Sequence, residues 1–314
     1  MKVLITGGSG FIGSHIADQL VERGDQVLAL DNYATGRRDN LVIREGLSVA
    51  EGSIADREFV DAQFDSFGPD VVIHAAASYK DPHDWVGDSI TNVAGTAAVT
   101  QAAMRHEVDR FIYFQTALCY GLHPDTQPIT IDHDLRPWDS SYAISKTGGE
   151  AYIKMSGLDY MSFRLANGYG PRNISGPLPT FFHRLTNGQK CFVMDTRRDF
   201  VFIDDLVQVV VRAGDGEGES GDYHLSSGSD YSIQELFEAT VRAMGIELEE
   251  EVEVRERHPD DAYSILLDPS KTTSAFPGWE ANFDLNEGVR RAVGYYMEFG
   301  IEQTFTHLDL DSNE

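Results

Sequence analysis

A tyrosine and a lysine four residues apart, Tyr142 and Lys146 in the stretch YAISK, are the side chains of this sequence best suited to moving a proton. A spacing of four places both side chains on one face of a helix. The tyrosine phenol has a pKa near 10 in water and is a poor base at neutral pH, but a neighbouring ammonium group favours the phenolate. Lowering that pKa by about three units corresponds to about 4 kcal/mol. The pair therefore predicts acid–base chemistry at the start of a helix.

A glycine-rich turn near the N-terminus predicts a second kind of chemistry, the binding of a phosphate group. In the stretch TGGSGFIGS, Gly7, Gly10 and Gly13 follow a predicted strand over 2–6 and precede a predicted helix over 11–23. Glycines permit a tight turn and a close approach of backbone to pyrophosphate, and the helix N-terminus adds unpaired N–H groups and a positive dipole end. In this context the motif indicates a dinucleotide site.

A carboxylate at the end of the second strand indicates which dinucleotide binds. Asp31 stands eighteen residues beyond Gly13, in the stretch LALDNY. A carboxylate at this place accepts hydrogen bonds from the adenosine ribose hydroxyls and repels a 2′-phosphate, so NAD is favoured over NADP. Arg37 and Arg38 follow closely and leave NADP open at this point.

The elements that must hold these residues alternate between apolar runs and amphipathic stretches. Buried strands are expected over 2–6, 26–30, 71–77, 110–116 and 160–166, and helices over 11–23, 56–67, 88–106 and 141–156. This β-α-β alternation is typical of a doubly wound parallel sheet, so the fold class is α/β with a Rossmann sheet. Thr116 then ends the fifth strand, and Tyr142 and Lys146 begin the helix that follows it.

The second half of the chain predicts a smaller, mixed α/β C-terminal domain, because the alternation loosens after about residue 171. We expect residues 1–171 to form the NAD-binding domain, with 198–227 crossing back to its sheet. Residues 172–197 and 228–314 are expected to form the substrate-binding domain.

The charge balance of the chain limits its partners. Its 314 residues include 51 acidic and 25 basic side chains, which gives a formal net charge of −26. Nucleic acid is repelled by such a chain unless a local basic stripe exists, and the sequence has none. The acidity fits either a surface kept soluble by repulsion or an adaptation to high salt, where screening removes the self-repulsion.

The sequence lacks the signals of secretion, membrane insertion and metal binding. Its start has no apolar run with a cleavage site, and no apolar run reaches the roughly 20 residues that cross a bilayer. Two cysteines, Cys119 and Cys191, support no disulfide framework, and the ten histidines form no metal-binding pair. We expect a cytoplasmic protein with no metal ion and no membrane partner.

Over nearly its whole length the chain resembles the extended short-chain dehydrogenases, in their nucleotide-sugar epimerase/dehydratase branch. The matching stretches are TGGSGFIGSH, LDN, VIHAAA, NVAGT, QTALCYG, YAISKTGGE, RLANGYGPR and RRDFVFIDD. The stretches KDPHDW and FQTALCYG are similar to bacterial sugar epimerases of surface-polysaccharide (O-antigen) pathways. The resemblance implies NAD as cofactor, a nucleotide sugar as substrate and a homodimer formed through helices 88–106 and 141–156.

The same resemblance implies roles for residues at the cofactor and the reacting sugar. Thr116 would hydrogen-bond the reacting hydroxyl, Tyr142 would be the acid/base, and Lys146 would bind the nicotinamide ribose and lower the tyrosine pKa. The implied NAD contacts are Gly7, Gly10, Phe11, Ile12, Gly13, Asp31, Asn32, Ser53, Ile54, Ala75, Ala76, Asn92, Tyr142 and Lys146. Ser53 stands where the branch often has an acidic residue, which weakens the implied adenine contact.

Further substrate contacts are implied beside Thr116. Asn167 and Arg198 would contact the diphosphate region, and Arg257, one position away from the usual arginine, would be its counterpart in this chain. Lys80 lies in the loop SYKDPHDW after the fourth strand, at the edge where ligands bind in such sheets. It would meet a substrate carboxylate or would be an ordinary surface lysine.

The residues after Thr116 narrow the reaction. Dehydratases of the branch have an Asp-Glu pair at the positions of Ala117 and Leu118, and decarboxylases have a Glu at the second position. The 3,5-epimerising reductases have a cysteine base at the second position, whereas Cys119 is one residue further, on the opposite face of an extended segment. A UDP-hexose or UDP-hexuronic acid 4-epimerase remains, which oxidises C4 and reduces it from the other face. The alternatives are a dehydratase or 4-keto-reductase of the same branch, and a non-catalytic NAD-sensing protein.

Overall fold

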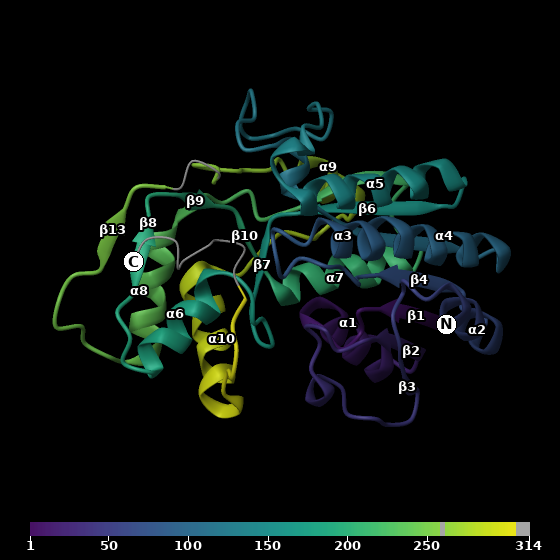
Figure 1. Cartoon of the computed structure of the whole chain (residues 1–314), viewed down its shortest axis with the longest axis horizontal. Coiled ribbons are helices and arrows are strands. Elements are labelled where there is room, and N and C mark those ends of the chain that lie inside the picture. Colours follow the sequence, from purple (N-terminus) through teal and green to yellow (C-terminus); the bar gives the residue numbers. More distant parts are fainter. Residues whose placement is uncertain (258–260, 306–314) are drawn as a thin grey trace.

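A computed structural model describes residues 1–257 and 261–305 of the chain. A sheet covered by helices occupies one side of the molecule, and a smaller group of helices and short strands lies beside it (Figure 1). None of the helices in the described residues is long and apolar enough to cross a membrane.

Seven parallel strands form the central sheet, in the order β11-β6-β5-β4-β1-β2-β3. Their bounds are β1 (Lys2–Thr6), β2 (Gln26–Asp31), β3 (Leu47–Glu51), β4 (Val71–His74), β5 (Arg110–Thr116), β6 (Tyr160–Leu165) and β11 (Gly221–Leu225). The central strands are runs of buried residues, as a sheet covered on both faces requires. The order reverses between β1 and β4, and ligands of such sheets bind at the carboxyl ends of the strands beside this point.

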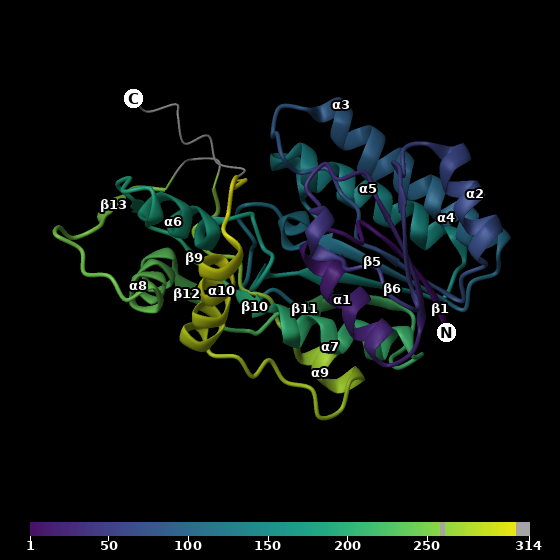
Figure 2. The same ribbon diagram turned by 90° about the horizontal axis from the view of Figure 1, so that it is seen from below.

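Helices cover both faces of the sheet (Figures 1 and 2). One face carries α1 (Phe11–Glu22) and α7 (Ile203–Gly214), and the other carries α2 (Arg57–Phe67), α4 (Thr96–Arg105) and α5 (Ser141–Ser156). Two separate buried clusters, one on each face, hold these layers together. The doubly wound α/β fold expected from the sequence is confirmed.

The elements follow the prediction with three differences: β3 was not predicted, the strand expected over 71–77 ends at His74, and one helix differs. β1, β5 and α5 have the predicted bounds, but the single helix expected over 88–106 is wrong. This run begins as α3 (Trp85–Asp88), continues as a π-helix (Ser89–Gly95) and ends as α4. Such wide turns are frequent at functional sites, and this one contains the buried Asn92, which bonds to two neighbouring segments described below.

The second half of the chain packs three helices, α6 (Pro177–Thr186), α8 (Ile233–Met244) and α10 (Leu285–Phe299), beside the sheet (Figure 1). Its remaining elements are the strand pairs β7 (Asn167–Tyr169) with β10 (Phe200–Phe202), β8 (Phe192–Met194) with β13 (Glu253–Arg255) and β9 (Arg197–Arg198) with β12 (Tyr231–Ser232), and the short helix α9 (Ser270–Ala275). The buried cluster on the α1 and α7 face continues without a break into these helices. The domain boundaries drawn from the sequence stay a prediction.

Candidate active site

A cavity of about 630 Å³ lies at the carboxyl ends of the central strands, where the order of the sheet reverses. Most of the predicted site residues line it. They are Gly7, Gly10, Phe11, Ile12, Gly13, Asp31, Asn32, Ser53, Ile54, Ala75, Ala76, Lys80, Thr116, Tyr142, Lys146 and Asn167. Three predicted residues, Asn92, Arg198 and Arg257, lie outside this lining.

Helix α1 begins at the cavity without a capping side chain. Gly10, the residue before the helix, provides no side-chain acceptor, and the first turn contains no acidic residue. The N–H groups at such an end have no partner within the helix and attract an anion. A Cβ added to Gly13 would lie 2.3 Å from the carbonyl oxygen of Gly7, so the turn and the helix pack this closely only with glycine. This end of the cavity fits a pyrophosphate group.

The Asp31 carboxylate is buried and oriented by its own surroundings. Its Oδ2 accepts a hydrogen bond from the backbone N–H of Ser9 at 2.8 Å, and its Oδ1 accepts one from the N–H of Tyr33 at 2.7 Å. Burial raises the pKa of Asp31, and the two N–H donors oppose that rise. Each carboxylate oxygen keeps a further lone pair, so the group fits the two hydroxyls of an adenosine ribose.

Arg37 and Arg38, which left NADP open, are paired with carboxylates outside the cavity lining. Nη2 of Arg37 lies 2.6 Å from Oδ2 of Asp39, and Nη2 of Arg38 lies 2.7 Å from Oε1 of Glu51. The Arg38 guanidinium also stacks over the ring of Tyr33, at 3.9 Å from its centroid. The carboxylate of Asp31 therefore sets the charge at this end of the cavity, which favours NAD.

Tyr142 and Lys146 project from α5 into the same cavity, as their spacing predicts. Burial raises the pKa of Tyr142, and the nearby Tyr79 and Asp88 add to that rise. Burial lowers the pKa of Lys146 to about 7, and the charge of Glu150 opposes this fall. A charged Lys146 favours the tyrosinate, and the joint role of the two groups in acid–base chemistry stays a prediction.

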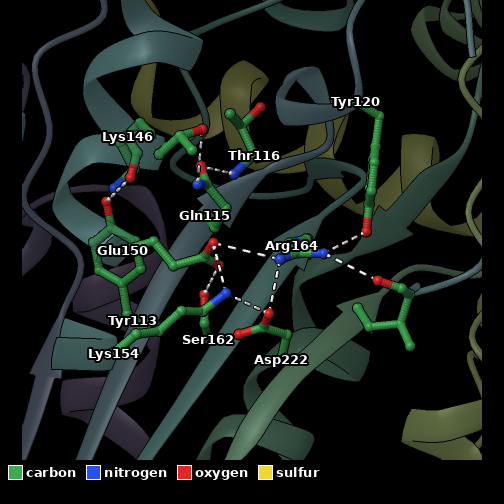
Figure 3. Close-up of polar contacts among 12 residues, drawn as sticks. Tyr113, Gln115, Thr116, Tyr120, Lys146, Glu150, Lys154, Ser162, Arg164 and Asp222 are labelled. Atoms are coloured by element: carbon green, nitrogen blue, oxygen red, sulfur yellow. Dashed lines mark hydrogen bonds and ion pairs between the residues drawn. The ribbon is translucent and has the colours of Figure 1, made fainter. Parts of the chain in front are cut away.

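Thr116 ends β5 at the cavity and is tied to α5 through its neighbour. The backbone N–H of Thr116 donates to Oε1 of Gln115 at 2.8 Å, and Nε2 of Gln115 donates to Oγ1 of Thr147 at 3.4 Å (Figure 3). The sequence did not single out Gln115, and its only signal was a buried polar residue in an apolar strand. The link fixes the end of β5 relative to the helix that carries Tyr142.

The segment after Thr116 is a 3₁₀ helix (Ala117–Tyr120), so the expectation of an extended segment is wrong. Oγ1 of Thr116 accepts a hydrogen bond from the N–H of Leu118 at 3.2 Å and caps this helix, which explains the turn. Cys119 is fully buried in the apolar core, and this burial raises the pKa of its thiol to about 12. Such a thiol is not a base at neutral pH.

Tyr79 is a cavity residue that the sequence prediction missed. Its ring lies edge-on to that of Tyr142, with 6.4 Å between the centroids, and its hydroxyl accepts a hydrogen bond from Oγ of Ser175 at 3.2 Å. The residue precedes Lys80 in the loop after β4, so the argument that pointed to Lys80 applied equally to Tyr79. It links the acid/base residue to the second half of the chain.

Asn92 braces the site from behind. Its side chain accepts from the N–H of Ser78 at 2.8 Å and donates to the carbonyl oxygen of Ser78 at 2.9 Å and to Oγ of Ser145 at 3.0 Å. Oγ of Ser145 donates in turn to the carbonyl oxygen of Tyr142 at 2.9 Å. The π-helix therefore ties the loop after β4 to the first turn of α5. The predicted contact of Asn92 with the cofactor stays a prediction.

Arg198 and Arg257 meet at Asp261. Nη2 of Arg198 lies 2.6 Å from Oδ1 of Asp261, and Nη1 of Arg257 donates to the carbonyl oxygen of Asp261 at 2.8 Å. Asn167 lines the cavity and donates through Nδ2 to the carbonyl oxygen of Asp199 at 3.2 Å. The structure brings the two arginines together, and the diphosphate contacts of all three residues stay predictions.

Lys80 lies at the rim of the cavity beside the end of the described chain. Its Nζ is 4.6 Å from the centroid of the Phe305 ring, and partial burial lowers its pKa. Phe305 is held there by backbone hydrogen bonds to Ile174 and Gly176, both at 2.9 Å. Across residues 1–257 and 261–305, no group of three His, Cys, Asp or Glu side chains is placed to hold a metal ion.

Comparison with known proteins agrees with this geometry. The model of the NAD dependent epimerase/dehydratase family matches residues 3–225. The Bordetella bronchiseptica enzyme WbmH, whose structure was solved with NAD⁺, is 54% identical to this chain and superposes with a TM-score of 0.92. The match covers 96% of this chain and 99% of that chain. WbmG of the same organism, solved with NAD and UDP, is 43% identical with a TM-score of 0.90, over 98% of each chain. The UDP-glucose 4-epimerase of Mycolicibacterium smegmatis is 32% identical over 319 residues, which cover 94% of this chain and 98% of that protein. Because the family model covers most of the chain and the relatives match it over nearly its whole length, this chain belongs to the NAD dependent epimerase/dehydratase family.

Proposed function

We propose that the protein is an NAD-dependent 4-epimerase of a UDP-linked hexose or hexuronic acid. One observation carries the proposal: Thr116, Tyr142 and Lys146 face one cavity, while the residues directly after Thr116 are Ala117 and Leu118. The site can therefore move one proton at a sugar hydroxyl, and the two positions directly after Thr116 carry no acid/base for elimination.

The residues of this chain divide the work at the hydroxyl. Tyr142 takes the proton of the hydroxyl as the carbon is oxidised and returns it after the sugar has turned. Thr116 holds the same oxygen in place, and Lys146 binds the ribose and keeps the tyrosine acidic enough to exchange its proton. Bound NAD supplies the reversible hydride acceptance that epimerisation requires.

Two acidic residues on the loop after β4 mark the alternative, a dehydratase with displaced acid/base groups. Asp81 and Asp84 line the cavity. Each accepts a backbone hydrogen bond within its own loop, Asp81 from the N–H of His83 at 2.8 Å and Asp84 from the N–H of Gly87 at 2.9 Å. Both carboxylates stand on the loop after β4 and not at positions 117 and 118, where the dehydratases of the branch have theirs, which favours the epimerase.

The reaction is tested by following hydrogen on the sugar. The protein is incubated with UDP-, dTDP- and GDP-sugars, and the products are read by NMR. With a substrate deuterated at C4, an epimerase keeps the label at C4 and incorporates no deuterium from D₂O. Solvent label at C6 identifies a dehydratase, and net consumption of added NADH identifies a 4-keto-reductase. No turnover of any sugar by NAD-loaded protein supports the NAD-sensing alternative.

The nucleotide and the sugar follow from two further features. WbmG was solved with UDP, and its similarity to this chain supports a UDP-linked substrate. Lys80 at the rim supports a carboxylate on the sugar, because a partly buried ammonium group gains from an anionic partner. A neutral UDP-hexose is the alternative substrate, since the Lys80 ammonium group already has a partner in the Phe305 ring.

A homodimer through α3, α4 and α5 is part of the proposal. These helices, together with the π-helix between α3 and α4, leave large apolar side chains exposed. They are Trp85, Val86, Ile90, Met104, Ile144, Tyr152 and Met155. A patch of this kind on one face suits a second copy of the chain, which would bury the same residues from both sides. The cytoplasmic location stays a prediction from the sequence.

The dimer is tested by placing a charge in this patch. We expect Ile144→Glu to convert a dimer into a monomer in light scattering, because two carboxylates would be buried at the symmetric contact. Met297→Glu is the control, since Met297 is also an exposed apolar residue and lies on α10, outside this patch. A monomeric parent protein, or a dimer that survives Ile144→Glu, contradicts the assignment.

A further inference from the structure

Lys146 is buried, and its ammonium group lies over an aromatic ring. Nζ of Lys146 is 4.1 Å from the centroid of the Tyr113 ring. Within the described residues, no carboxylate lies within 4.0 Å of this Nζ and no acceptor forms a hydrogen bond with it. In the described part of the chain, the Tyr113 ring is therefore the direct protein contact that attracts the charge of this ammonium group.

Tyr113 is fixed by two contacts with the same residue. It lies on β5, three residues before Thr116, and its side chain is fully buried. Its hydroxyl donates to the backbone carbonyl oxygen of Lys146 at 2.9 Å, as Figure 3 shows. A Cβ added to Gly149 would lie 2.9 Å from that hydroxyl, so α5 passes close to the ring only because this residue is glycine. The ring and the hydroxyl together hold both ends of Lys146.

The carboxylate one turn further along α5 is engaged elsewhere. Glu150 is buried, accepts a hydrogen bond from Oγ of Ser162 at 2.6 Å and pairs with Lys154 at 3.2 Å and Arg164 at 3.4 Å (Figure 3). Its charge raises the pKa of Lys146 from a distance, against the larger effect of burial. Glu150 thus contributes to the potential at Lys146 without accepting its N–H groups.

We propose that Tyr113 is the positioning residue that keeps Lys146 charged and directed into the cofactor cavity. The face of an aromatic ring attracts an ammonium ion without accepting its hydrogen bonds. All three N–H donors of Lys146 therefore stay available for ribose hydroxyls, and its charge stays available to Tyr142. A carboxylate in the place of the ring would accept those donors and neutralise the charge.

The titratable groups that face Lys146 come from three elements in the described chain. Tyr142 and Glu150 share α5 with it, Tyr113 lies on β5 and His74 lies on β4. Burial and the Lys146 charge lower the pKa of His74 to about 3, so this imidazole is neutral at every pH of interest. The contribution of the Tyr113 ring can therefore be isolated by changing that residue alone.

The pKa of Lys146 can be measured directly by NMR with lysine labelled with ¹³C at Cε. The chain has six lysines, so the signal of Lys146 is identified by its loss in Lys146→Arg. In Tyr113→Met the pKa of Lys146 should fall by about one unit, because the buried cation loses the ring. In Tyr113→Phe it should match the parent, since the ring remains and only the hydroxyl is lost.

Phe111→Met is the matched control. Phe111 lies two residues before Tyr113 on the same face of β5 and is fully buried in the same apolar cluster. The ammonium group of Lys146 lies over the Tyr113 ring and makes no such contact with the Phe111 ring. The Phe111→Met variant loses the same kind of ring and should leave the pKa of Lys146 unchanged. An equal fall in Phe111→Met would attribute the effect to a loosened core and overturn the proposal.

Two other results would also overturn it. One is an unchanged pKa in Tyr113→Met, and the other is an equal fall in Tyr113→Phe, which would assign the effect to the hydroxyl. If Tyr113→Met does not fold, fluorinated phenylalanines at position 113 preserve the ring size and weaken its face stepwise. The pKa of Lys146 should then fall with each added fluorine, and a constant value contradicts the ring contact.

This inference rests on the proposed function only where it says that Lys146 binds the ribose and supports Tyr142. The NMR titration needs no sugar substrate, so its result stands whether or not the protein is an epimerase. Retention of NAD after gel filtration gives a second readout, because a neutral Lys146 binds the ribose less well. We expect Tyr113→Met to lose NAD faster than the parent at a pH between its own lowered Lys146 pKa and the parent pKa of about 7, and Tyr113→Phe and Phe111→Met to match the parent.

Discussion

The two ends of the cavity are built in different ways. The end that fits adenosine and pyrophosphate consists of the turn over 7–13 and Asp31, and their groups are held by backbone atoms nearby. The end that fits the sugar combines Thr116, Tyr142 and Lys80 from separate elements, and side-chain contacts of other residues hold each of them in place. The comparison teaches that cofactor binding depends on local geometry, whereas the chemistry depends on how distant elements pack.

The largest expected effect separates chemistry from binding at the sugar end. Tyr142→Phe should reduce turnover by about 10²- to 10⁴-fold, because it removes only the transferable proton. Binding of NAD and of nucleotide sugar, measured by calorimetry, should match the parent. Turnover within threefold of the parent would contradict the role of Tyr142. It would also contradict the assignment of the chemistry to the sugar end of the cavity.

The second effect belongs to the adenosine end alone. Asp31→Ala should weaken NAD binding by about 10- to 100-fold, since two charge-assisted hydrogen bonds to the ribose are lost. NADP binding should weaken far less, because its 2′-phosphate is no longer repelled. Asp39→Ala is the control, as it removes a nearby carboxylate that Arg37 holds outside the cavity lining. An equal loss for both cofactors would place the ribose elsewhere.

A smaller effect tests the rim of the sugar end. Lys80→Met should raise the KM for a UDP-hexuronic acid by about five- to tenfold and leave kcat unchanged, because an exposed charge contributes modestly to binding. The KM for a neutral UDP-hexose should not change. Lys190→Met is a matched control, since Lys190 is exposed and pairs with Glu250 away from the cavity. Equal effects on the KM of both sugars would show that Lys80 does not bind a substrate carboxylate and is an ordinary surface lysine.

The smallest effect acts on both ends alike. The formal charge of −26 is spread over the chain, so 2 M KCl should raise the melting temperature by a few degrees through screening. The affinity ratio between NAD and NADP should stay the same, because Asp31 is buried and screened little. A melting temperature that is flat from 0.1 to 2 M KCl supports the reading of the acidity as a means of solubility.

The turn and the carboxylate that the sequence assigned to the adenosine end line the cavity, whereas Arg198 and Arg257, assigned to the substrate, lie outside its lining. The glycine turn and Asp31 lie within one β-α-β unit, where spacing alone fixes the geometry. Tyr79 and Gln115 were missed because their partners, Ser175 and Thr147, come from other elements. Pairings of this kind depend on tertiary packing, which residue spacing does not encode.

The fold shows the same division between local and distant information. Apolar runs predicted β1 and β5 to the residue, since a buried parallel strand has a distinct composition. The π-helix over 89–95 was not predicted, and the bonds that Asn92 makes from it to Ser78 and Ser145 join segments far apart in the sequence. The resemblance to the family, and not periodicity, led to the assignment of Thr116.

The unbroken core between the sheet and the second half limits how new specificities can arise in this chain. Phe202 packs against Phe283 at 4.2 Å and against Tyr169 at 5.4 Å between ring centroids, so the residues behind the sugar end are shared by both halves. A recombination event or a laboratory graft that exchanged the second half would have to carry this shared interior with it. New sugar preferences are therefore reached more readily by point changes at the rim than by shuffling whole modules.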